Sequence, residues 1–307
     1  MRIIVTGGAG FIGSHVVDAY LQAGHHIAVI DDLSTGLRAH VHQKTRLYTT
    51  DIRNAKLVSR IFEREHPEVV NHHAALASVV ASMREPTATL ETNTVGTMNL
   101  LRALGVHGRG IKRFIFASTG GALYGNPKTL PADEHTAPHP LSPYALSKLF
   151  AEGVVRYYAE SLKLPFVILR YANVYGPRQN PHGEAGVFAI FSNLMQQGKQ
   201  PTIFGDGSKT RDYVYVGDVA HANVLALQKA TNEAVNIGTG KAVSDQMVFD
   251  TIATSLGFKK SPRYAPFRPG EVMHIRLDVK KAHRMLNWQP KVSLRDGVAK
   301  TTQSFAK

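Results

Sequence analysis

Tyr144 and Lys148 are the residues whose types and spacing point most directly to chemistry. They are four positions apart, so a helix would place both side chains on one face. Such a helix is predicted to begin here, because Ser142 is a suitable N-cap and Pro143 suits the first helical position. A nearby ammonium favours the ionised form of a tyrosine, whose pKa is ordinarily about 10. Tyr144 could therefore take a proton from a substrate hydroxyl; alternatively, it is a surface aromatic residue beside a solvated lysine.

Two hydroxyl side chains could assist that proton transfer. Ser118 and Thr119 come just after the apolar run 114–116, at the expected end of a central strand. In sheets of parallel strands wrapped by helices, the carboxyl ends of the strands face the binding cleft. We therefore expect both hydroxyls to point toward the cleft.

A cluster of glycines follows the first apolar run of the chain and precedes a helix-like pattern. Gly8, Gly10 and Gly13 satisfy G-x-G-x-x-G, and Gly7 adds a further position without a side chain. Such a turn lets backbone N–H groups approach a pyrophosphate, and the helix behind it adds partial positive charge. The residues expected to bind a dinucleotide here are Gly7, Gly10, Phe11, Ile12 and Gly13.

An acidic residue ends the second apolar run, 27–31, at the position where a ribose could be bound. Asp31 lies 18 residues beyond Gly13, and a carboxylate there can accept a hydrogen bond from the ribose 2′-hydroxyl. It would repel a 2′-phosphate, so NAD is favoured over NADP. Asp32 is either the ribose ligand instead or a solvated loop residue.

Further candidate cofactor ligands follow the next predicted strands. Asp51 and Ile52 end the third, where Asp51 could reach an adenine amino group or cap the next helix. Ala74 and Ala75 are small enough to let backbone lie against a cofactor. Asn93 falls in a helical pattern over 86–104, where a buried amide needs partners. It could hold the geometry of the site or bond to a neighbouring strand.

Apolar runs alternate with helix-like segments through the first part of the chain. The runs are 3–5, 27–30, 47–49, 69–70, 114–116 and 166–169. This alternation predicts an α/β fold with a doubly wound parallel sheet of the Rossmann type. Beyond Arg170, short apolar pieces are separated by Gly and Pro, which predicts a smaller, loop-rich α/β lobe. We expect an NAD-binding domain over 1–169 and a substrate lobe over 170–307, with 211–238 returning to the first domain.

The composition excludes several classes of function. The chain has no cysteine, which excludes disulfides, thiolate metal sites and thiol nucleophiles. Adjacent histidines on a strand, such as His72 and His73, point to opposite faces, so we expect no metal. No apolar run approaches the length of a membrane span, so we expect a cytoplasmic protein without a membrane partner. The net charge of +13 suits an anionic ligand, but the basic residues are scattered, so we expect no nucleic acid.

Taken together, these motifs resemble the extended short-chain dehydrogenase/reductase family, and within it the UDP-glucose 4-epimerases. The resemblance covers nearly the whole chain. It is carried by the glycine motif, Asp31, Asp51, His73-x-Ala75, Asn93, Ser118-Thr119, Tyr144-x-x-x-Lys148, the segments 170–178 and 202–213, and Arg268-Pro-Gly-Glu271.

The resemblance implies a nucleotide-sugar 4-epimerase with permanently bound NAD. Tyr144 would deprotonate the sugar O4 while C4 loses a hydride, giving a transient 4-keto sugar. Lys148 would orient the nicotinamide ribose and, together with the positive nicotinamide, lower the pKa of Tyr144. The second lobe would bind a UDP-sugar through Asn173, Arg211, Arg268 and Glu271. The helices 86–104 and 144–162 would pair two subunits as a homodimer.

Departures from the family pattern bear on the substrate and the mechanism. Thr119 is followed by Gly120 rather than by the glutamate of the related dehydratases, so elimination lacks its base. One extra residue before Tyr124 leaves the choice between Ser118 and Thr119 open, and we favour Thr119. Ile275 occupies a position where a tyrosine restricts the sugar pocket in resembling epimerases. We therefore expect room for UDP-N-acetylhexosamines.

Two other functions compete with this hypothesis. Another nucleotide-sugar short-chain enzyme, such as a UDP-glucuronate epimerase or an NAD(P)-dependent reductase, would share most of the motifs. A nucleic-acid-binding protein that kept the fold without catalysis would account for the basic charge.

Overall fold

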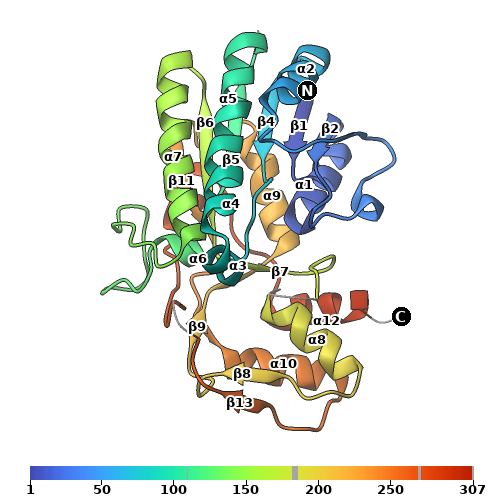
Figure 1. Ribbon diagram of the computed structural model, residues 1–307. Coiled ribbons are helices and arrows are strands. Elements are labelled where there is room, and N and C mark those ends of the chain that lie inside the picture. Colours follow the sequence, from blue (N-terminus) through green and yellow to red (C-terminus); the bar gives the residue numbers. More distant parts are fainter. Residues whose placement is uncertain (109, 182–185, 269–270, 306–307) are drawn as a thin grey trace.

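A seven-stranded parallel sheet forms the larger part of the molecule in the computed structural model, which describes residues 1–108, 110–181, 186–268 and 271–305 (Figure 1). Its strand order is β11-β6-β5-β4-β1-β2-β3. The strands are β1 (Arg2–Thr6), β2 (His26–Asp31), β3 (Arg46–Thr49), β4 (Val69–His72), β5 (Arg113–Thr119), β6 (Phe166–Tyr171) and β11 (Glu233–Ile237). All six predicted strands are confirmed, and β11 joins them from the later part of the chain.

Helices cover both faces of this sheet because successive strand residues point to opposite sides. Ile4 of β1 packs against one helical layer, and Ile3 and Val5 of the same strand pack against the other. The first layer contains α2 (Ala55–Glu65), α5 (Gly96–His107) and α7 (Pro143–Leu162). The second contains α1 (Phe11–Gln22), α9 (Val216–Ala226) and α11 (Lys280–Leu286). This confirms the predicted Rossmann-type fold class.

The predicted helix over 86–104 differs from a regular α-helix. It consists of α4 (Pro86–Leu90), a π-helical turn η2 (Glu91–Val95) and then α5. The π turn carries the buried Asn93, whose side chain bonds to residues outside this helix. Helical turns of this type often occur at functional sites, where a side chain has to be placed out of regular spacing.

The smaller lobe lies beyond the carboxyl ends of the sheet (Figure 1). Its core is formed by aromatic and aliphatic side chains such as Phe188, Phe249 and Val298. The helices that supply them are α8 (Val187–Gln196), α10 (Asp245–Leu256) and α12 (Leu294–Phe305). Short strand pairs complete the lobe: β8 (Thr202–Phe204) with β13 (Arg263–Ala265), and β9 (Thr210–Arg211) with β12 (Val243–Ser244).

Short elements lie in the segments that follow the carboxyl ends of the strands. They are η1 (Arg38–His40), α3 (Val79–Arg84), α6 (Gly120–Leu123), and the paired strands β7 (Asn173–Tyr175) and β10 (Tyr213–Tyr215). No helix in the described part of the chain combines the length and apolarity that a membrane span requires.

Candidate active site

One cavity of about 1990 Å³ runs along the carboxyl ends of the strands and into the smaller lobe. It brings together residues as far apart in the chain as Gly7 and Glu271. The sequence-predicted residues that line it are Gly7, Gly10, Phe11, Ile12, Gly13, Asp31, Asp32, Asp51, Ile52, Ala74, Ala75, Ser118, Thr119, Tyr144, Lys148, Asn173, Arg211, Arg268 and Glu271.

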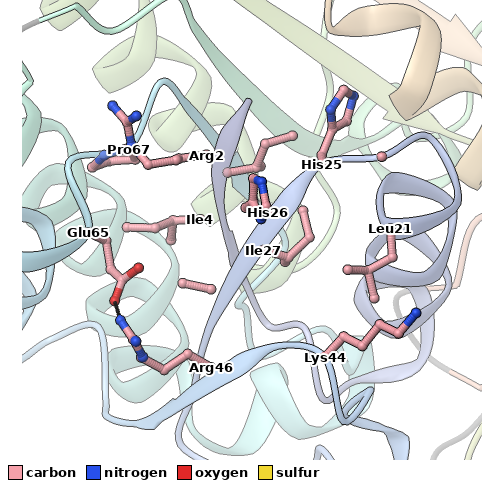
Figure 2. A pocket seen from close by; sticks show the side chains of 13 residues that line it. Arg2, Ile4, Leu21, His25, His26, Ile27, Lys44, Arg46, Glu65 and Pro67 are labelled. Atoms are coloured by element: carbon pink, nitrogen blue, oxygen red, sulfur yellow. Dashed lines mark hydrogen bonds and ion pairs between the residues drawn. The ribbon is translucent and has the colours of Figure 1, made fainter.

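A second depression, of about 630 Å³, lies at the opposite end of β1 and β2 (Figure 2). It is lined by the amino-terminal residues of these strands, such as Arg2 and His26, and by Arg46, which pairs with Glu65. Ligands of open α/β sheets bind at the carboxyl ends of the strands. The larger cavity is therefore the candidate active site.

The glycine turn is shaped for a phosphate group. Gly7 has a φ of 71°, and its N–H donates to the carbonyl of Ile30. A Cβ on Gly13 would lie 2.1 Å from the Gly7 carbonyl oxygen, so the backbone packs too tightly there for any side chain. Gly10 is the N-cap of α1 and provides no side-chain cap, which leaves the helix N-terminus open toward the cavity. These features fit the pyrophosphate of a dinucleotide.

Asp31 and Asp32 have different surroundings. Asp31 is buried at the end of β2, and its carboxylate accepts hydrogen bonds from the N–H groups of Ala9 and Leu33, both at 2.9 Å. Burial raises the pKa of Asp31, and these two bonds oppose that effect. The exposed Asp32 accepts from the N–H and hydroxyl of Ser34. Asp31 is thus held rigidly on the cavity wall, whereas Asp32 caps a local turn.

Asp51 pairs with Arg53 at 2.6 Å, and this interaction lowers the pKa of the Asp51 carboxyl group. It does not cap the following helix, because Asn54 is the N-cap of α2. Asp51 and Ile52 both line the cavity.

Asn93 is a structural link rather than a wall of the cavity. Its side chain accepts from the N–H of Leu76 at 2.8 Å and donates to the Leu76 carbonyl at 3.0 Å and the Ser147 hydroxyl at 2.9 Å. It thereby ties the loop after β4 to α7. Because Asn93 is not among the described residues that line the cavity, the geometry supports the first of its two expected roles, holding the site together.

Tyr144 and Thr119 meet on the wall of the cavity. Burial raises the pKa of Tyr144 to about 12, and a side-chain hydrogen bond with Thr119 acts in the opposite direction. Ser118 instead donates to Glu152 at 2.6 Å inside the protein. The geometry therefore favours Thr119 as the hydroxyl that acts beside Tyr144.

Lys148 lies one helical turn further along α7. Its ammonium donates to the carbonyl of Ala117 at 2.8 Å and lies 4.9 Å from the centre of the Phe116 ring. Burial lowers the pKa of Lys148 to about 8, although Glu152 opposes the shift. The protein alone thus raises the pKa of Tyr144 instead of lowering it.

The second lobe contributes two arginines and an acidic residue. Arg211 donates to the carbonyls of Thr210 and Met273. The guanidinium of Arg268 stacks 3.6 Å from the centre of the Phe204 ring. Both line the cavity, so their remaining N–H groups can reach phosphate oxygens.

Glu271 is ion-paired with the buried Lys209, which also contacts Asp245 at 3.4 Å. Pro269 and Gly270, between Arg268 and Glu271 in the expected motif, lie outside the described residues.

Asn173 and Ile275 occupy contrasting positions. The side-chain oxygen of Asn173 is buried without a hydrogen-bond partner among the described residues, and the residue lines the cavity. Ile275 is 1% exposed, belongs to a buried hydrophobic core cluster, and is not among the described lining residues. Its expected role beside the sugar gains no support from this position.

Sequence reasoning missed Glu152 and Arg170. Their side chains form a buried ion pair at 2.7 Å directly behind Ser118. The signal was present, because Tyr144, Lys148 and Glu152 continue the same four-residue spacing. No group of three or more potential metal ligands occurs within the residues that the structure describes.

Comparison with known proteins identifies the family. Residues 3–238 match the model of the "NAD dependent epimerase/dehydratase family". The UDP-glucose 4-epimerase of Mycolicibacterium smegmatis is 41% identical, with 99% of this chain and 98% of that protein aligned.

Two crystal structures have nearly the same fold. One is UDP-glucose 4-epimerase from Thermotoga maritima with UDP-glucose, with a TM-score of 0.97 and 46% identity over 99% of this chain and 98% of that one. The other is the Thermus thermophilus UDP-glucose 4-epimerase in complex with NAD, with a TM-score of 0.94 and 42% identity over 99% of both chains. The predicted family resemblance and NAD as cofactor are confirmed. The chain belongs to the NAD-dependent epimerase/dehydratase family.

Proposed function

We propose that this chain is an NAD-dependent UDP-glucose 4-epimerase that interconverts UDP-glucose and UDP-galactose. The observation that carries the proposal is the cavity in which Tyr144 and Thr119 lie between the glycine turn and the arginines of the second lobe. One end suits a dinucleotide and the other suits a sugar diphosphate. The activity of its relatives supports the same conclusion.

Tyr144 is the proposed base for the sugar O4. When bound, NAD would accept the hydride from C4 and return it, so that no net oxidation would occur. Tyr144 takes the O4 proton while Thr119 hydrogen-bonds the same oxygen, and the sugar becomes a transient 4-keto sugar. Lys148 holds a positive charge one turn away, which favours tyrosinate. Proton return from Tyr144 then completes the reaction after the sugar has turned over.

Asn173, Arg211 and Arg268 are the proposed ligands of the UDP diphosphate. Guanidinium groups donate several hydrogen bonds to phosphate oxygens, and both arginines lie on the cavity wall. Glu271 is the proposed neighbour of the nucleotide ribose, held in place by Lys209.

The proposal is tested by incubating purified protein with UDP-glucose and following UDP-galactose by chromatography, with no added NAD. We expect conversion, and we expect NAD to be released when the protein is denatured. UDP-N-acetylglucosamine and UDP-glucuronate are assayed alongside. Conversion of UDP-glucuronate alone would show that the chain is a UDP-glucuronate epimerase. Turnover that consumes added NAD(P)H stoichiometrically would show that it is a reductase.

A homodimer formed by α5 and α7 is part of the proposal. These neighbouring helices expose large apolar side chains: Val106 is 72% exposed, Tyr157 is 68% exposed and Phe150 is 49% exposed. Exposed apolar side chains on adjacent helices are typical of protein interfaces. We also propose a cytoplasmic location, where its nucleotide substrates would be available.

The division into two interleaved domains also remains a proposal. It is supported by β11 pairing with β6 and by α9 packing beside α1, so part of 211–238 belongs with the NAD-binding sheet.

A further inference from the structure

A short segment after β7 is attached to α1, a helix from the other end of the chain. We call this segment, residues 176–179, the strap. The carbonyl oxygen of Pro177 accepts a hydrogen bond from His15 at 2.9 Å. The guanidinium of Arg178 forms an ion pair with Asp18 at 2.7 Å. Because residues three apart in a helix are neighbours on its surface, the strap is held at two adjacent points of α1.

The hydrogen bond from His15 has a defined direction. A carbonyl oxygen can only accept, so the Nε2 atom of His15 carries the proton. Burial lowers the pKa of His15, and the bond to Pro177 opposes that shift. The ring is therefore neutral near pH 7. It also lies edge-on to Phe11, with 6.1 Å between the ring centres, so its orientation is supported from the start of α1.

The backbone of the strap is held in an unusual shape. Arg178 has a φ of 66°, in the left-handed region that residues with a side chain rarely adopt. Gly176 has a φ of 153°, and a Cβ there would lie 2.4 Å from a methyl carbon of Val216, the first residue of α9. A strained conformation persists only where the surrounding contacts impose it. The contacts with α1 and α9 therefore keep the strap in place.

The strap and the start of α1 line the same cavity. Pro177, Arg178 and Gln179 are lining residues, and so are Gly10 and Phe11. The glycine turn before α1 has the shape that fits a pyrophosphate, and NAD is the cofactor of this family. The strap thus joins the cavity wall to the helix that begins at the glycine turn.

We propose that the strap is a latch that retains NAD, and that its contacts with His15 and Asp18 must break before the cofactor leaves. An ion pair between partly exposed side chains is weak, so the latch can open. Each contact nevertheless adds to the barrier for release. The inference goes beyond the proposed function, because it concerns the cofactor and holds for any sugar substrate.

The test measures NAD exchange without turnover. Protein saturated with NAD is freed of excess cofactor and mixed with isotopically heavy NAD. Mass spectrometry of the NAD released on denaturing timed samples gives the exchange rate. Asp18→Asn removes the charge and keeps the shape, and we expect exchange about two to five times faster than in the parent. Glu233→Gln is the control, because it breaks a 2.8 Å ion pair with Lys281 between residues that are not among those described as lining the cavity. It should exchange at the parental rate.

His15 provides an independent test. His15→Leu removes the donor and should speed exchange about two- to tenfold, whereas His15→Gln retains an N–H donor and should stay closer to the parent. Thermal unfolding of the NAD-free variants separates latch opening from a general loss of stability. Parental exchange rates in folded Asp18→Asn and His15→Leu would overturn the inference, as would equally fast exchange in Glu233→Gln. A parent that retains NAD but does not epimerise UDP-glucose would instead contradict the proposed function alone.

Discussion

At the scale of single residues, the site depends on which hydroxyl or carboxylate meets which partner. Tyr144 contacts Thr119, whereas Ser118 is directed to Glu152. These two residues are adjacent on one strand, yet Thr119 lies beside Tyr144 and Ser118 lies behind it. This division follows from strand geometry, because successive side chains point to opposite faces.

Replacing Tyr144 with phenylalanine removes the proton-transferring oxygen and preserves the ring. We expect kcat to fall by a factor of about 10² to 10⁴, the usual contribution of a positioned acid–base group. The measurement is UDP-galactose formation at saturating UDP-glucose, with NAD content determined after denaturation. A variant that retains both NAD and near-parental kcat would show that Tyr144 is not the base.

Alanine substitution at Ser118 and at Thr119 should affect different properties. Thr119→Ala should lower kcat by about 10² or more, because it removes a hydrogen bond to the reacting oxygen. Ser118→Ala should lower the free energy of unfolding by about 1.5–3 kcal/mol, since it removes a hydrogen bond to the buried charge of Glu152. Steady-state kinetics and urea unfolding of both variants test this. The reverse pattern would return the catalytic role to Ser118.

At the scale of elements, α1 and α7 position the two groups of residues that form the candidate site. The open N-terminus of α1 faces the cavity, and α7 presents Tyr144 and Lys148 one turn apart. Ser142 caps α7 by accepting from the N–H of Ala145, as predicted. Each helix begins at the carboxyl edge of the sheet, so both present their first turns to the cavity.

Two glycines in these helices should respond in opposite ways to alanine. A Cβ at Gly13 would collide with the Gly7 backbone, so Gly13→Ala should destabilise the fold by about 1–3 kcal/mol and reduce bound NAD. Within one subunit, a Cβ at Gly153 in α7 meets nothing within 4 Å, so Gly153→Ala should stabilise the folded subunit by about 1 kcal/mol. Thermal unfolding and NAD content distinguish the two. Full NAD occupancy in Gly13→Ala would contradict the tight packing of the turn.

At the scale of the whole molecule, a single sheet organises both lobes. The chain leaves the sheet after β6, contributes to the second lobe, and returns to add β11 beside β6. The cavity is lined both by residues between 7 and 148 and by residues between 171 and 305. Neither part of the chain forms the site by itself.

Tyr157→Glu should disrupt the proposed dimer. Burying an unpaired carboxylate at an apolar interface carries a large free-energy penalty, because the charge loses its hydration. We therefore expect sedimentation velocity to show a monomer. The control is Tyr264→Glu, which changes a similarly exposed tyrosine on the second lobe, at 56% exposure. If both variants sediment as the parent does, α5 and α7 do not form the interface.

The sequence alone determined the fold class, the glycine turn, the start of α7 and the presence of Tyr144 and Lys148 one turn apart on that helix. These features depend on local signals: alternating apolar runs, a capping serine and proline, and residues four positions apart in one helix. The family and NAD followed from the same motifs, and the comparisons confirmed both.

Only the tertiary structure decided which distant groups meet. Asn93 links Leu76 to Ser147, Ile275 is buried in the core, and Arg170 pairs with Glu152. Each outcome depends on contacts between segments far apart in the chain, and hydrophobic spacing carries no information about such partners. These hydrogen bonds, ion pairs and packing contacts gain their strength from the low-dielectric interior of the protein. That interior exists only once the sheet and its helices have assembled.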